Sequence, residues 1–118
     1  MTDYEQELQK KLQGWYFSKY RKMSLYQMIK HHIECVSYKT GMLRPKDMPV
    51  FKVFKEGAIV KHGKCVQGYF NKEKCELWFD TTATHEVLKH EIGHYLFDYL
   101  PIKGRLIHEY IAHWCERI

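Results

Sequence analysis

Apolar residues recur every three or four positions in the first third of the chain, which is the spacing of one helical face. The clearest stripe is formed by Leu25, Met28, Ile29, Ile33 and Val36. Ser24 and Gln27 give the capping-box pattern that begins a helix, and Gly41 is typical of a helix end. Two helices are therefore predicted, beginning near Thr2 and Ser24. His32 lies on the second stripe, so it is predicted to be a core histidine.

In the middle of the chain the pattern changes to short segments rich in β-branched and aromatic residues. Residues 50–54 form the first, and residues 65–70 and 75–79 flank the polar stretch 71–74 as the two strands of a hairpin flank their turn. Residues 59–60 add a possible short strand. Helices followed by a small, mostly antiparallel sheet and then by further helices predict an α+β fold.

Helical spacing returns near the C-terminus. A long helix is predicted from residues 82–84 to just before Pro101, with a core stripe of Leu88, Ile92, Tyr95, Leu96 and Tyr99. A last helix over residues 104–117 carries Ile107, Tyr110, Ile111, Trp114 and Ile118 on its apolar side. Gly93 in the interior of the long helix costs about 1 kcal/mol relative to alanine, so another element is expected to pack closely there.

Composition limits the class of protein. With 118 residues and 45% hydrophobic content, the chain is predicted to be one domain, 1–118, made of a helical part (1–44), a sheet (50–80) and two site-bearing helices (82–118). The N-terminus does not resemble a secretory signal, and no apolar run approaches the ~18 residues of a membrane span, so a cytoplasmic protein with no membrane partner is expected.

The charges and cysteines add little specific chemistry. The net charge of +5 is modest, and the basic segment 10–22, although interleaved with aromatic residues as in single-strand binding proteins, fits an amphipathic helix better, so direct contact with nucleic acid is not expected. The four cysteines form no C-x-x-C pair and are predicted to be reduced thiols. His62, Cys65 and Cys75 are an alternative structural zinc site, but a fourth ligand at suitable spacing is missing.

The most specific chemical signal is the H-E-x-x-H run formed by residues 90–94 in the long helix. Positions four apart lie on one helical face, so the imidazoles of His90 and His94 can bind a single zinc ion. Glu91 then lies beside the metal, where a carboxylate can take a proton from a metal-activated water. His90 and His94 are therefore predicted metal ligands, and Glu91 is the predicted catalytic base.

A catalytic zinc site needs a third protein ligand. Asp98 lies eight residues beyond His90, which is about 12 Å along a helix and too far for one metal ion. The last helix is expected to run antiparallel to the H-E-x-x-H helix after a short turn, and it brings Glu109 and His113 towards the two histidines. Spacing leaves both residues open as the third ligand and slightly prefers His113, which is expected level with the midpoint of His90 and His94.

Residues 89–97, together with the Gly-Tyr-Phe strand at 68–70, resemble the ImmA/IrrE-type gluzincin metallopeptidases, which show a Gly-Tyr strand and an H-E-[hydrophobic]-G-H helix. In that family a downstream glutamate in an E-x-x-A-[N/D] pattern is the third zinc ligand. Residues 109–112 match its first four positions, whereas His113 stands where Asn or Asp is expected and the spacing from His94 is shorter than usual. The resemblance covers about residues 50–116.

The resemblance implies a minimal zincin-like domain that acts as a zinc-dependent endopeptidase, with Glu109 as the third ligand and His113 as the alternative. Its implied substrate is a specific protein partner, such as a helix-turn-helix repressor of a phage or mobile element. The alternative is a non-catalytic binding protein that keeps the zincin scaffold, an anti-repressor or host-factor inhibitor, and the short spacing to Glu109 supports it.

Overall fold

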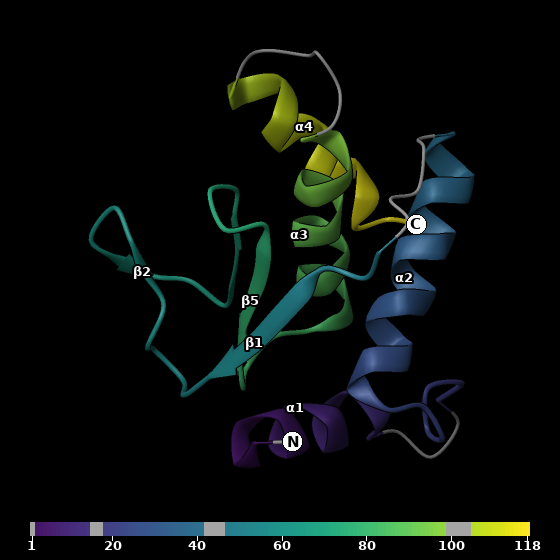
Figure 1. The fold of residues 1–118 in the computed structure, drawn as a ribbon, viewed down its shortest axis with the longest axis vertical. Helices are drawn as coiled ribbons and strands as arrows, with labels where there is room; N and C mark the ends of the chain where they lie inside the picture. The colour runs from purple at the N-terminus through teal and green to yellow at the C-terminus, as the bar shows by residue number, and fades with distance from the viewer. Residues whose placement is uncertain (1, 15–17, 42–46, 99–104) are drawn as a thin grey trace.

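The chain follows the predicted order of helices and strands (Figure 1). The structure, a computed structural model, describes residues 2–14, 18–41, 47–98 and 105–118. The elements are α1 (Asp3–Gln13), α2 (Leu25–Thr40), β1 (Val50–Phe54), β2 (Val60–Lys61), β3 (Lys64–Cys65), β4 (Gly68–Asn71), β5 (Glu76–Asp80), α3 (His85–Phe97) and α4 (Arg105–Cys115). The predicted α+β fold is thus confirmed. Tyr99 and the turn at 101–104 lie outside the described residues, as do the aromatic residues 15–17 of the basic segment.

Local signals set the ends of the two N-terminal helices. Thr2 caps α1 by accepting a hydrogen bond from the Glu5 backbone N–H. At the start of α2, Ser24 and Gln27 form the complete predicted capping box, each side chain accepting from the other residue's backbone N–H. Gly41 ends α2 with φ of 72°, a left-handed conformation that glycine adopts without strain. Both predicted helix starts are confirmed.

The main sheet has the strand order β1-β5-β4. β4 and β5 form the predicted antiparallel hairpin, with Phe70 opposite Leu77, whereas β1 pairs with β5 in parallel. The predicted strand 65–70 is divided in two, because β3 pairs with β2 in a separate hairpin and β4 begins only at Gly68. Two of the three described pairings are antiparallel, in agreement with a mostly antiparallel sheet.

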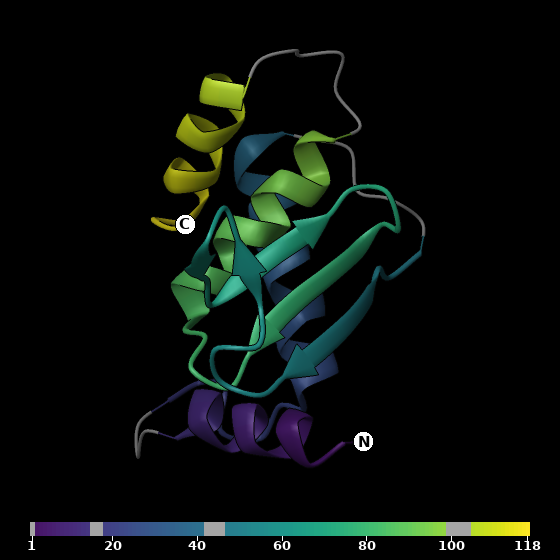
Figure 2. The same ribbon diagram turned by 90° about the vertical axis from the view of Figure 1, so that its left-hand side faces the viewer.

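The sheet packs on one side of α3, and α2 packs on the other (Figure 1). Figure 2 shows the sheet from its outer face, with α2 and α3 behind it and α1 across one end. The core between these layers contains Leu77 and Phe79 of β5 and the described part of the predicted α3 stripe, Leu88, Ile92, Tyr95 and Leu96. All four cysteines are free thiols, as expected. Among the described helices, none is long and apolar enough to cross a membrane.

The contact between α3 and α4 is built around Gly93. A Cβ atom at this position would lie 3.0 Å from the Sγ atom of Cys115 and 3.3 Å from the Cα atom of Ala112, so only glycine allows this approach without adjustment. Ala112 and Cys115 are fully buried. The close packing expected at Gly93 is therefore present.

The apolar side predicted for α4 packs only in part, because Ile111 and Ile118 pack against the core whereas the other three residues do not. Ile107, Tyr110 and Trp114 are 48%, 77% and 47% exposed, because the small residues of the helix face Gly93 instead. This arrangement brings the two helices close enough for polar side chains along their shared edge to meet.

Candidate metal centre

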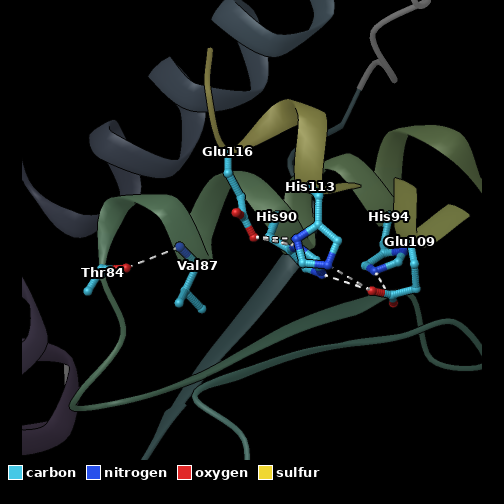
Figure 3. A network of polar contacts seen from close by, with 7 residues as sticks. All are labelled: Thr84, Val87, His90, His94, Glu109, His113 and Glu116. Atoms are coloured by element: carbon cyan, nitrogen blue, oxygen red, sulfur yellow. Dashed lines mark hydrogen bonds and ion pairs between the residues drawn. The ribbon is translucent and has the colours of Figure 1, made fainter. Parts of the chain in front are cut away.

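α3 places His90 and His94 on one face, as their spacing predicts. The helix is capped by Thr84, whose hydroxyl accepts from the Val87 N–H (Figure 3). The ring centroids of His90 and His94 are 4.9 Å apart, and their side chains are only 15% and 17% exposed. Both rings point towards α4, which runs antiparallel to α3 because His94 meets Glu109 and His90 meets Glu116.

Glu109 brings one carboxylate to both histidines. Its Oε1 atom lies 3.0 Å from the Nε2 atom of His94, and its Oε2 atom lies 3.6 Å from the Nε2 atom of His90. Ligand atoms of a tetrahedral zinc site with bonds of about 2.0–2.1 Å are roughly 3.4 Å apart. The two contacts lie close to that separation but are made by different oxygens of Glu109, and the motif group whose ligand atoms all lie within 4.8 Å of one another is His90 with Glu91 and His94. The Glu109 side chain is 45% exposed, which leaves the group open to solvent.

His113 occupies a different place from Glu109. Its ring packs edge-on against His90 at 4.8 Å between centroids, and its side chain is 64% exposed. Its Nε2 atom lies 3.7 Å from Oε2 of Glu109, and its Nδ1 atom lies 3.3 Å from Oε1 of Glu116. His113 therefore lies beside His90, and Glu109 is the residue that contacts both histidines of the motif. Asp98 pairs with Lys72 at 3.3 Å, at the end of α3.

Glu116 belongs to the site, although the sequence interpretation did not include it. Its Oε1 atom lies 2.7 Å from the Nδ1 atom of His90. An ionised carboxylate only accepts, so the Nδ1 atom of His90 carries the proton and its Nε2 atom is the one left for a metal. Glu109, His113 and Glu116 have the spacing i, i+4, i+7 of one helical face. The sequence signal for Glu116 is its position one helical turn beyond His113, on the face that Glu109 and His113 share.

Glu91 lies beside the histidines but is buried, with 7% exposure. Burial raises its pKa to about 8, and the negative charges of Glu109 and Glu116 act in the same direction. The Phe70 backbone N–H donates to its carboxylate and opposes the rise in pKa. A Cβ atom on Gly68 would lie 2.7 Å from Val87 and 3.1 Å from Cγ of Glu91, so glycine lets β4 approach Glu91 this closely.

Two groups of side chains in the described residues are arranged to hold a metal ion, and both include His90. The first is His90 with Glu91 and His94, and the second is His90 with His113 and Glu116. The alternative group of His62, Cys65 and Cys75 does not appear among them. The described part of the chain thus concentrates its metal-binding chemistry along the α3–α4 contact.

No protein-family model, curated protein or solved structure matches this chain. The functional argument therefore depends on the residues and geometry of the chain itself.

Proposed function

We propose that the protein is a zinc-dependent endopeptidase of the gluzincin type. The observation that carries this proposal is the convergence of the His90 and His94 Nε2 atoms on the Glu109 carboxylate, with Glu91 buried on the same turn of α3. The H-E-x-x-H spacing alone gives two imidazoles on one face. Glu109 adds a third ligand from a second helix. An H-E-x-x-H run that arose by chance would not be accompanied by such a carboxylate.

The donor set favours zinc over other divalent ions. Two imidazole nitrogens and one carboxylate are a common catalytic zinc set, whereas magnesium and calcium prefer oxygen ligands alone. His90, His94 and Glu109 would hold the ion. When bound there, zinc supplies an acidified water and polarises the carbonyl of the peptide bond.

Glu91 is the proposed general base. Its carboxylate takes the proton of the attacking water and passes it to the leaving amine of the cleaved bond. A carboxylate oxygen of Glu91 lies within 4.8 Å of a ring nitrogen of both His90 and His94, which places this base beside the proposed ion. The Phe70 N–H holds the carboxylate in place from β4.

The proposed substrate is a segment of a specific protein partner. β4 is the terminal strand in the order β1-β5-β4 and lies next to Glu91, and an extended peptide can add to such an edge by backbone hydrogen bonds. The net charge of +5 favours an acidic partner surface. On the basis of the resemblance to ImmA/IrrE-type enzymes, the proposed partner is a helix-turn-helix repressor.

A second candidate function is a non-catalytic protein that binds a partner through the same scaffold. The exposed Ile107, Tyr110 and Trp114 of α4 favour it, because large apolar side chains in solvent are typical of contact surfaces. In this case zinc would hold α3 and α4 together without hydrolysis.

The decisive test compares zinc-loaded wild type with Glu91→Gln on a library of proteome-derived peptides, scored by mass spectrometry of new N-termini. We expect cleavage by the wild type and a loss of at least about 100-fold in Glu91→Gln at equal zinc content. Glu86→Gln, an exposed position on the same helix, is the matched control and should cleave normally. Zinc-loaded wild type that cuts no peptide would favour the binding protein, and equal cleavage by Glu91→Gln would contradict the role of Glu91.

A further inference from the structure

His90 presents its two ring nitrogens to two different sets of ligand atoms. Nε2 faces Glu109, which belongs to the proposed zinc site, whereas Nδ1 lies 2.7 Å from Oε1 of Glu116. The same oxygen of Glu116 lies 3.3 Å from Nδ1 of His113. Figure 3 shows His113 and Glu116 on α4, to one side of the pair formed by His94 and Glu109. One ligand atom from each of His90, His113 and Glu116 lies within 4.8 Å of the others.

We propose that His113 and Glu116 form a second, inhibitory cation site that competes with His90 for Glu116. This inference rests on the proposed zinc site and adds regulation to it. A cation held by Nδ1 of His113 and the Glu116 carboxylate takes the oxygen that now accepts the His90 Nδ1–H. His90 then loses the carboxylate that orients its ring towards the first site.

The second site is weaker than the first for structural reasons. His113 and Glu116 are more exposed than the motif histidines, at 64% and 32%, and come from one helix. His90 can complete the second set only by giving up the proton on Nδ1. The first site has three ligands from two helices, and an ion bound there leaves the hydrogen bond between His90 and Glu116 intact. Occupation of the second site therefore begins only when the first is filled.

The chemistry of the second site selects the ion. Imidazole and carboxylate together bind zinc and similar transition ions, whereas magnesium, which requires oxygen ligands, is excluded. The two sites are coupled through His90, so a second ion weakens the first by the same factor by which the first weakens the second. Excess zinc is thus predicted to inhibit the protein, and magnesium is not.

A zinc titration of the metal-free full-length chain, with calorimetry and a competing zinc indicator, tests the second site without any substrate. Wild type should bind one zinc tightly and a second at least about 10-fold more weakly. His113→Ala and Glu116→Gln should keep the tight event and lose the weak one. Glutamine at 116 retains a carbonyl oxygen that accepts from His90 Nδ1, so the first site keeps its orientation while the second loses its carboxylate.

The matched control is His31→Ala. His31 and Glu34 have the same i, i+3 spacing on α2 as His113 and Glu116 have on α4, but they are not part of a metal-binding group in the described residues. This variant should bind both zinc ions as the wild type does. A weak event that is lost in His31→Ala and kept in His113→Ala would overturn the proposal, as would saturation of wild type at one zinc.

The outcome for the second site is separable from that for the first. Absence of tight zinc in wild type, with a weak event that disappears in His113→Ala, would contradict the proposed peptidase while supporting the second site. A tight event that is lost in Glu109→Ala, with no weak event in wild type, would support the first site and overturn the second.

Discussion

Two groups of histidines lie along α3, and their surroundings are opposite in character. At the start of the helix, His85 contacts His32 of α2, which is only 2% exposed, and Tyr20 stacks on the His85 ring at 4.1 Å. Further along, His90 and His94 face the carboxylate of Glu109 at a surface open to solvent. The first group is packed inside the fold, and the second belongs to the side chains that could hold a metal ion.

The hydrogen bonds explain why the first group is structural. His85 Nε2 lies 3.0 Å from the Leu12 carbonyl oxygen, which can only accept, so this nitrogen carries a proton. In the neutral ring Nδ1 then accepts from Nε2 of His32, 2.9 Å away. Burial lowers the pKa of His32 to about 3 and also lowers that of His85. Histidines whose nitrogens are used within the fold join helices, whereas histidines that face carboxylates and solvent are available to a metal.

The comparison is tested most strongly by removing one histidine from each group. His94→Ala should weaken zinc binding by more than about 100-fold, because it removes a ligand rather than a group that orients one. His32→Ala should leave zinc affinity unchanged and lower the free energy of unfolding by about 1–3 kcal/mol, because His85 loses its buried partner. Zinc titration and chemical denaturation of both variants measure the two effects. Equal losses of zinc affinity would contradict the division into two groups.

The two groups should also differ in their response to pH. The folded pKa of His32, about 3, lies below its ordinary value of 6.5, so between these values the unfolded chain binds more protons. Stability should therefore fall as the pH is lowered from about 6.5, by up to about 1.4 kcal/mol per pH unit for this residue. His32→Gln cannot titrate and should show a smaller slope of unfolding free energy against pH. Identical slopes for wild type and variant would show that His32 is not held neutral by the fold.

Gly93 sharpens the comparison, because it sets the distance between α3 and α4. Gly93→Ala places a methyl group against Cys115, and overpacking of this kind costs about 1–3 kcal/mol. The higher helix propensity of alanine offsets about 1 kcal/mol of that cost. We expect weaker zinc binding in this variant, with a net loss of stability measured by denaturation. Glu86→Ala, on the exposed side of α3, should leave zinc affinity unchanged, and an unchanged zinc affinity in Gly93→Ala would contradict the proposed spacing role.

The smallest effect is expected for the carboxylate that orients His90. Glu116→Ala should weaken zinc binding about 10–100-fold, whereas Glu116→Gln, which keeps an acceptor for His90 Nδ1, should stay close to wild type at the tight site. Competition with a zinc chelator measures the affinities. Equal affinities for the alanine variant and wild type would show that His90 does not need Glu116.

The parts of the molecule that follow from the sequence are those with local causes. The capping box at Ser24 and the hairpin of β4 and β5 depend on residues close together in the chain, and both are confirmed. The core position of His32 follows from its helical stripe and is also confirmed.

The remaining features depend on contacts between elements. The parallel pairing of β1 with β5 has no local signature, since either direction buries the same alternate residues. The predicted apolar side of α4 is only partly correct, because the small Ala112 and Cys115 approach Gly93 while only Ile111 and Ile118 of the predicted side pack against the core. Burial of Glu91 likewise depends on the approach of β4, which Gly68 permits. Gly93 and Gly68 therefore mark the close contacts of α3 with α4 and β4, which the apolar stripes do not show.

The most direct test of the central claim is the zinc content of the purified chain, measured by elemental analysis for wild type, Glu109→Ala and His113→Ala after dialysis against a weak chelator. The proposed site predicts one zinc ion per chain in wild type and in His113→Ala, and almost none in Glu109→Ala. Wild type without zinc, or Glu109→Ala that keeps a full zinc ion, would contradict the claim that His90, His94 and Glu109 form the metal site.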